Sequence, residues 1–173
     1  MLDPSSLSRR SLLTAGVVLF QPLACASTKL PPSRVSRHLG AALPSFTGTT
    51  VNGSEFDSNS SRGMVLLVEF FQCNEGSRSL ADAAALYTNK RELVIVGVSL
   101  DDSIERTRAF VARREVKFPI LFDPKRSVAA LVGVTDPKTT LAIDRRGILR
   151  WVGDPTKPGV VEQATEALLD ESA

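Results

Sequence analysis

The sequence has few thiol and imidazole groups, the side chains that bind soft metals or form disulfides: among 173 residues there are two cysteines, Cys25 and Cys73, and one histidine, His38. A copper site needs several soft or imidazole ligands, so we expect no metal, and nothing in the sequence indicates another cofactor. If the chain is cleaved after Ala26, Cys73 becomes its sole thiol. An internal disulfide is then excluded, and core packing must hold the fold together.

An excess of charge of one sign is also lacking, since the formal net charge is +2. No stripe of basic residues is interleaved with aromatic ones, so we expect no nucleic acid as a partner. The arginine pairs at 113–114 and 145–146 are interpreted as solvated surface. Long hydrophobic runs are missing as well: residues 15–20 are apolar, whereas a membrane-spanning helix needs about 20 such residues.

The N-terminus has the three parts of an export signal in the expected order. Arg9 and Arg10 precede the short apolar run, and Ala24 and Ala26 flank Cys25 in a small-x-small cleavage site. This pattern predicts a twin-arginine signal over residues 1–26, and therefore a periplasmic protein. The alternative interpretations are a basic disordered tail or a buried helix.

Cys25 offers a second possibility, which is a lipid anchor. A lipobox usually has Leu three residues before its cysteine, but Pro22 stands there. Soluble release after Ala26 is therefore favoured, and a membrane is expected as a partner only if Cys25 is lipidated. Residues 27–37, which include Pro31 and Pro32, are predicted to be a flexible tether, and the folded domain is predicted over residues 38–173.

The hydrophobic pattern of this domain alternates strands with helices. Asn52-Gly53 marks a hairpin, and the continuous aliphatic run 93–99 indicates a parallel strand covered on both faces. Asp102 and Glu105 form a capping-box pattern for a helix that extends to Arg114. The other predicted elements are strands at 64–71 and 118–122, helices at 77–87, 126–132 and 160–169, and a hairpin of 139–144 with 148–152. This order predicts an α/β fold with a central mixed sheet and helices on both faces.

Cys73 lies on the turn between the strand at 64–71 and the helix at 77–87. The N–H groups and dipole at the start of a helix favour a thiolate, so we expect a moderately lowered pKa for this thiol. Disulfide-exchange proteins of the thioredoxin type have a second cysteine three residues later. In this chain the turn continues Asn74-Glu75-Gly76, so that Gly76 occupies the place of the second cysteine.

Several phrases in the right order resemble the redoxin branch of the thioredoxin superfamily, which includes TlpA/ResA-type thiol oxidoreductases and AhpC/TSA-type peroxiredoxins. They are Ala42–Phe46, Gly63–Phe70, Val96–Asp101, Phe118–Pro124 and Thr139–Gly147. The resemblance covers roughly residues 40–169 and implies a thioredoxin-like three-layer sandwich. It also implies that the active site is degenerate.

The resemblance aligns Cys73 with the nucleophilic cysteine when it is anchored on residues 85–87. If the alignment with the family is fixed at residues 68–70 instead, the usual Cys-x-x-Cys falls on residues 75–78, where no cysteine occurs. We favour the first anchor because it keeps a thiol at the helix start. The peroxiredoxin motif would need Pro at 66 and Thr at 70, where Leu66 and Phe70 stand.

Two further comparisons follow from the resemblance. The Sco-type copper chaperones have Cys-x-x-x-Cys and a later histidine, whereas Ser77 replaces the second cysteine in this chain. Family members also have a proline, commonly cis, in a loop that faces the thiol. Pro137 is a candidate for it, and Lys138 is the alternative occupant of the same place, with Thr139 completing the active-site loop.

Two functions remain open. The first is an exported thiol oxidoreductase in which Cys73 attacks a disulfide or a peroxide, and an external thiol from a protein or a small molecule resolves the product. The second is a redox-inactive binding or scaffold domain that has kept the fold, since buried free cysteines are commonly inert.

Overall fold

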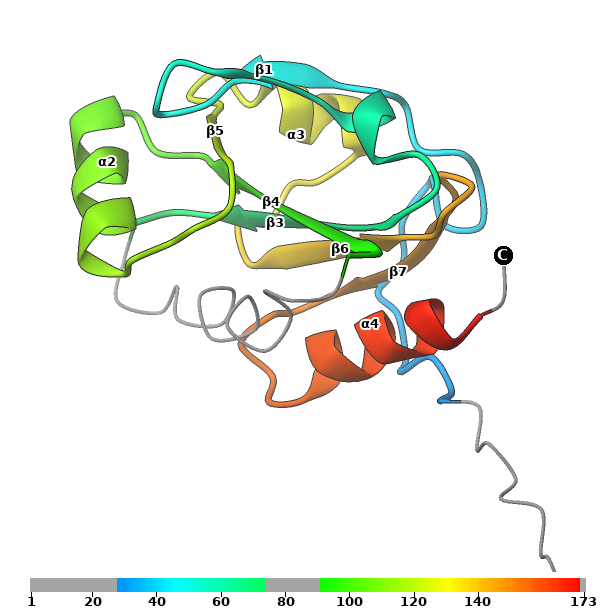
Figure 1. The fold of residues 1–173 in the computed structure, drawn as a ribbon. Coiled ribbons are helices and arrows are strands. Elements are labelled where there is room, and N and C mark those ends of the chain that lie inside the picture. The colour runs from blue at the N-terminus through cyan, green and yellow to red at the C-terminus, as the bar shows by residue number, and fades with distance from the viewer. Residues whose placement is uncertain (1–27, 74–90, 172–173) are drawn as a thin grey trace, which may run out of the picture.

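The computed structural model describes residues 28–73 and 91–171. Its centre is a mixed sheet with the strand order β5-β4-β3-β6-β7 (Figure 1). The strands of this sheet are β3 (Val65–Phe71), β4 (Leu93–Ser99), β5 (Ile120–Phe122), β6 (Thr139–Ile143) and β7 (Leu149–Gly153). A separate hairpin pairs β1 (Thr47–Thr49) with β2 (Glu55–Asp57). The helices are the 3-10 helix η1 (Ser58–Ser61), α2 (Ile104–Arg113), α3 (Ser127–Val132) and α4 (Val160–Asp170).

β3 and β4 form the middle of the sheet because both consist mainly of apolar residues that can be covered on two faces. All seven residues of β3 are buried, and β3 pairs in parallel with β4 from Val65↔Leu93 to Phe71↔Ser99. β5 lies on the other side of β4, so the strand predicted over residues 93–99 is internal, as expected.

The hairpin predicted for residues 139–144 with 148–152 is confirmed by the antiparallel pair of β6 and β7. The turn between them uses Gly147 at φ +80°, and the Gly147 N–H donates to the Asp144 carbonyl at 2.8 Å. Glycine takes this conformation without the steric cost that a Cβ would bring. Trp151 on β7 is 1% exposed, so its ring is part of the core.

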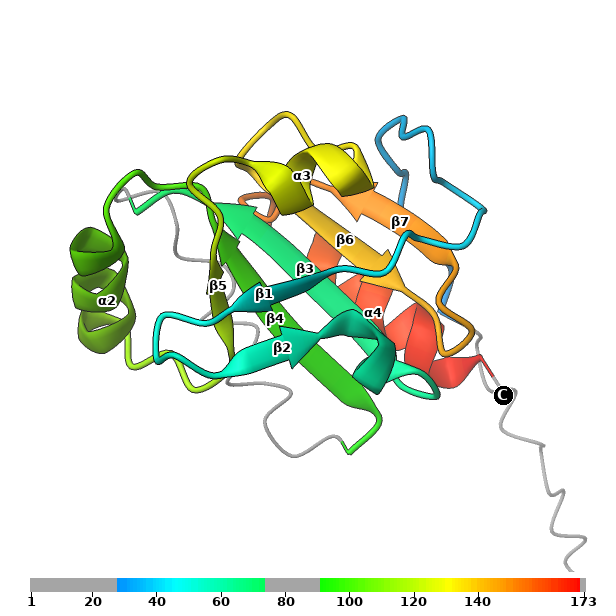
Figure 2. The same cartoon turned by 90° about the horizontal axis from the view of Figure 1, so that it is seen from above.

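The two faces of the sheet are covered by different elements (Figures 1 and 2). Phe46, just before β1, and side chains of β2 and α3 pack on one face, where they meet alternate residues of β3 and β4 such as Val68 and Val96. Helix α4 packs on the opposite face against Leu67, Ala142 and Trp151. This layered arrangement confirms the predicted α/β thioredoxin-like fold.

The start of helix α2 differs from the expected capping box. Ser103 is the N-cap, and its hydroxyl accepts from the Arg106 N–H at 3.1 Å. The Asp102 side chain is 86% exposed and forms an ion pair with Arg106 at 3.5 Å. Ser103 takes the capping role because it, and not Asp102, stands directly before the first helical residue.

Residues 28–37, expected as part of a flexible tether, make specific contacts with the sheet. The Arg34 N–H donates to the Val152 carbonyl at 2.7 Å, and the indole N–H of Trp151 donates to the Pro32 carbonyl at 3.2 Å. The Ser33 hydroxyl accepts from the Val152 N–H at 2.9 Å. These contacts cover the outer edge of β7, which would otherwise present unpaired backbone groups.

The predicted helix at 77–87 and the predicted signal at 1–26 lie outside the described residues. Within residues 28–73 and 91–171, no helix has the length and apolar character that a membrane crossing requires.

Candidate active site

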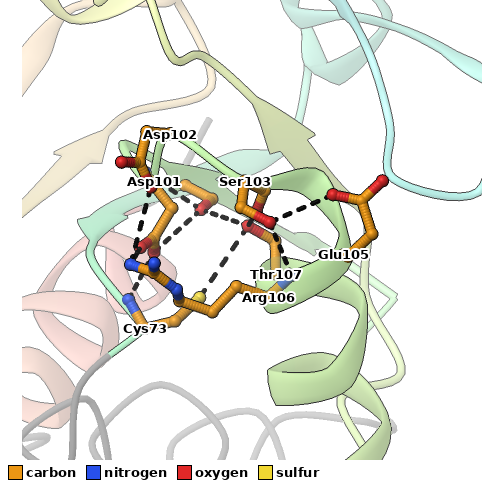
Figure 3. Close-up of polar contacts among 8 residues, drawn as sticks. Cys73, Asp101, Asp102, Ser103, Glu105, Arg106 and Thr107 are labelled. Atoms are coloured by element: carbon orange, nitrogen blue, oxygen red, sulfur yellow. Dashed lines mark hydrogen bonds and ion pairs between the residues drawn. The ribbon is translucent and has the colours of Figure 1, made fainter.

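Cys73 stands two residues beyond the end of β3, as the strand pattern predicted. Because β3 and β4 are parallel, the segments that follow them meet at the same edge of the sheet. The segment after β4 brings Asp101 beside Cys73, and helix α2 follows directly (Figure 3). Cys73 is a free thiol of intermediate exposure.

Asp101 joins three parts of the chain at this edge. Its Oδ2 accepts from the Cys73 N–H at 2.5 Å, and it lies 3.5 Å from the Ser99 hydroxyl oxygen. Its Oδ1 accepts from Nη1 of Arg106 at 3.2 Å. The residue is 5% exposed, whereas the Arg106 side chain is 57% exposed. Asp101 is therefore a buried carboxylate with a partly solvated cation as its counter-ion.

The sulfur of Cys73 faces hydroxyl groups on its polar side and hydrocarbon on the other. Sγ lies 3.8 Å from Oγ1 of Thr107, and that oxygen lies 2.9 Å from the Ser99 hydroxyl. Thr107 and Ser99 are both fully buried. The apolar side belongs to a cluster that includes Phe71 and Phe110.

This environment raises the pKa of the Cys73 thiol to about 11. Burial is the largest cause, since it disfavours the charged thiolate, and the hydrogen bond and negative charge of Asp101 act in the same direction. Hydrogen bonds from Thr107 and Ser99 oppose the shift. The expectation of a lowered pKa is therefore wrong, because burial and a neighbouring carboxylate prevail at this thiol.

The structure describes only some residues of the predicted active-site loop. Asn74, Glu75 and Gly76 lie outside the described residues. Thr139 begins β6 and pairs with Phe70 near the end of β3, so residues 137–139 reach the same edge of the sheet as Cys73.

Both candidates for the proline position, Pro137 and Lys138, lie within the described residues. The described chain contains no cis peptide bond, so the bond before Pro137 is trans, the default for X-Pro bonds in folded proteins. Lys138 is exposed, its N–H donates to Asp136, and its carbonyl accepts from Arg34. Lys138 is not among the groups that shift the pKa of Cys73.

Asp101 and Thr107 are the site residues that the sequence analysis missed. Asp101 was recognised only as the last residue of the segment Val96–Asp101, which resembles the family, and Thr107 only as part of a helix. The signal that could have found Asp101 is its place directly after a parallel strand next to that of Cys73. Among the described residues, no group of three His, Cys, Asp or Glu side chains could hold a metal ion.

Comparison with protein families gives a match over most of the folded domain. Residues 39–152 match the model of the AhpC/TSA family. A thioredoxin-like protein of Bacillus subtilis, YneN, is 27% identical over 126 residues, which is 68% of this chain and 74% of that protein.

Solved structures with the same fold come from several bacteria. A thioredoxin-family thiol:disulfide interchange protein from Chlorobium tepidum has a TM-score of 0.62 and 22% identity, covering 78% of this chain and 99% of its own. A secreted disulfide oxidoreductase of Mycobacterium tuberculosis, described as homologous to DsbE of Escherichia coli, has a TM-score of 0.58 and 21% identity, with coverages of 70% and 93%. At these identities the likeness shows the fold alone.

Proposed function

The chain belongs to the AhpC/TSA family, and on this premise we propose that it is a thiol-disulfide oxidoreductase that works through the single cysteine Cys73. The observation that carries the proposal is the position of this free, half-buried thiol after β3, at the edge where the segment after β4 and the start of β6 also meet. The names of the relatives, which include a thioredoxin-like protein and a thiol:disulfide interchange protein, support it.

The exchange step follows the ordinary chemistry of thiolates. The Cys73 thiolate attacks one sulfur of a disulfide RS–SR, a new S–S bond joins Cys73 to that sulfur, and RS⁻ leaves and takes up a proton. A second, external thiol then attacks the mixed disulfide, forms a disulfide with the bound group and returns Cys73 to its reduced state. An external thiol is needed because Gly76 stands at the place of the second cysteine.

The raised pKa makes this exchange slow at neutral pH. A rise from 9.0 to about 11 reduces the thiolate fraction about 100-fold. The more basic thiolate is a better nucleophile, which returns about tenfold of the loss. The net expectation is a rate about tenfold below that of an exposed thiol, before any steric hindrance by the surrounding cluster.

The raised pKa of Cys73 and its apolar packing favour a second candidate function. A thiol that is protonated at neutral pH and packed against Phe71 and Phe110 also suits a binding or scaffold domain without redox activity. In that case the fold is retained for its surface, and the thiol is part of the core.

The two candidates are separated by reaction with oxidised glutathione. The native protein starting at Ser27, in which Cys73 is the sole thiol, is incubated with oxidised glutathione between pH 7 and 10.5, and the adduct is quantified by mass spectrometry, with Cys73→Ser as the control. We expect an adduct whose rate of formation rises about tenfold per pH unit, because the thiolate fraction rises in that proportion below the pKa. If native protein forms no adduct at any pH while unfolded protein does, the binding-domain function replaces the oxidoreductase.

We also propose that the protein is exported, with residues 1–26 as a twin-arginine signal. Arg9 and Arg10, the short apolar run and the Ala24-Cys25-Ala26 site support this proposal. One of the similar structures is described as a secreted protein. Soluble release after Ala26 is proposed over a lipid anchor on Cys25 because Pro22 interrupts the lipobox.

A further inference from the structure

Three buried polar side chains lie on the polar side of Cys73, and the exchange step proposed above uses none of them. Ser99 and Thr107 are fully buried and Asp101 is 5% exposed. They form a connected group, because Thr107 lies 2.9 Å from Ser99 and Ser99 lies 3.5 Å from Asp101. Buried polar groups are costly unless they are paired, so the pairing that each makes decides which protonation state of the sulfur is favoured.

The protons available in this group can be assigned from the distances. Thr107 has one hydroxyl proton, which it can donate to the Ser103 carbonyl at 3.1 Å or toward the sulfur at 3.8 Å. While Cys73 is a thiol, its S–H donates to Oγ1 of Thr107, and Thr107 donates to the Ser103 carbonyl. Every group then has a partner, and the thiol form is satisfied.

A thiolate reverses these requirements. It has no proton to donate, so Thr107 must release the Ser103 carbonyl and donate to the sulfur, while Ser99 donates to Oγ1 of Thr107. Asp101 cannot follow this change, because an ionised carboxylate only accepts hydrogen bonds and its charge repels the thiolate.

We propose that Asp101 and Thr107 are opposed positioning residues of the Cys73 thiol: the Asp101 carboxylate favours the protonated thiol, and the Thr107 hydroxyl is the donor that the thiolate requires. The inference deepens the proposed function and rests on it, since it concerns the reactivity of the same sulfur. It assigns to Asp101, in the connection between β4 and α2, and to Thr107, on α2, the control of when that sulfur becomes a nucleophile.

The directions in which neighbouring groups shift the pKa of Cys73 agree with this geometry. Asp101 raises it, and Thr107 and Ser99 lower it. Among the described residues, the charged side chains connected to the thiol are Asp101 itself, Arg106 on its Oδ1, and Asp102, which binds the same guanidinium. Arg106 forms an ion pair with Asp101 at 3.2 Å (Figure 3). Its positive charge partly neutralises the carboxylate, so the position of Arg106 modulates the effect of Asp101 on the thiol.

The test measures the rate at which iodoacetamide alkylates Cys73 in the native protein as a function of pH. Asp101→Asn removes the charge but keeps an oxygen that can accept from the Cys73 N–H, whereas Thr107→Val removes the hydroxyl at nearly constant volume. Asp102→Asn is the matched control, because this aspartate is 86% exposed and forms an ion pair with the same arginine at 3.5 Å.

We expect Asp101→Asn to increase the alkylation rate at pH 8 by about tenfold. This is the change that one pH unit produces in the rate profile of the unchanged protein below its pKa. Thr107→Val should decrease the rate several-fold, and Asp102→Asn should leave it within about twofold. A purely structural role would loosen the packing in both variants and accelerate both. Equal directions for the two variants, or no change in either, would overturn the inference.

A second variant keeps the inference testable if Asp101→Asn does not fold. Arg106→Gln changes a largely exposed side chain and leaves the Asp101 charge unopposed, so the alkylation rate should fall. An increase would contradict the proposal. Alkylation needs no disulfide substrate, so its outcome is independent of whether the protein forms the glutathione adduct on which the proposed function depends.

Discussion

At the residue scale, the packing near the thiol is set by a glycine on β4. A Cβ added at Gly97 would lie 2.5 Å from Cδ1 of Ile120 and 3.0 Å from Cε1 of Phe71. Phe71 is the last residue of β3, two residues before Cys73, and Cys73 packs against the cluster that contains Phe71 and Ile120. The close packing of these two side chains over Gly97 therefore fixes the apolar side of the thiol.

Gly97→Ala should therefore destabilise the fold by about 1–3 kcal/mol, because an extra methyl in a close-packed core forces side chains off their rotamers. Chemical denaturation of the purified variant measures this change. Gly48→Ala is the matched control, since its Cβ would meet Leu121 at 3.4 Å, an ordinary contact. If the two variants are equally stable, the packing argument at Gly97 is wrong.

Also at this scale, the place of Cys73 could be predicted from the sequence but its proton affinity could not. The strand pattern located the thiol after β3. Asp101, which is 28 residues away in the chain, raises its pKa, and this contact exists only because two parallel strands end together. Local sequence around Cys73 contains no sign of this carboxylate.

At the element scale, strands and helices with a strong hydrophobic pattern were predicted almost to the residue. β4 at Leu93–Ser99 and α4 at Val160–Asp170 match their predictions closely, because continuous burial and 3.6-residue periodicity are properties of the segment itself. Residues 28–37 lack such a pattern. They dock through backbone groups on β7, which leave no periodicity in the sequence.

The docking predicts that a chain starting at His38 is less stable than one starting at Ser27. The shorter chain loses the hydrogen bonds that Pro32, Ser33 and Arg34 make with β7, each worth about 1 kcal/mol, together with the ion pair of Arg34 and Asp154. We expect a loss of about 2–4 kcal/mol in denaturation experiments. The fluorescence of Trp151, the one tryptophan of the sequence, should shift to the red as its indole becomes exposed.

Val35→Ser in the longer chain is the control, because Val35 is fully exposed within the same segment and should change the stability by less than about 0.5 kcal/mol. If the two chains are equally stable, the docking argument is wrong and residues 27–37 are a flexible tether, as the sequence predicts.

At the scale of the whole molecule, the docked segment begins very close to the proposed cleavage site. The Thr28 hydroxyl donates to Asp170 at 3.1 Å, and the Lys29 carbonyl accepts from Gln163 at 2.9 Å, so contacts with α4 start two residues after Ala26. Cleavage there would release the folded domain with almost no free N-terminal tail. It would also remove Cys25 and leave Cys73 as the sole thiol of the exported protein.

The export proposal makes the last prediction. Replacing Arg9 and Arg10 by lysine should leave the precursor in the cytoplasm of a host with a twin-arginine translocase, because the route recognises the arginine pair and not its charge alone. The same exchange at Arg113 and Arg114, in the folded domain, is the control and should not affect export. Fractionation with N-terminal sequencing measures both, and the exported protein should begin at Ser27. A lipid-modified Cys25 in the membrane fraction would contradict soluble release, and normal export of the lysine variant would contradict the twin-arginine route.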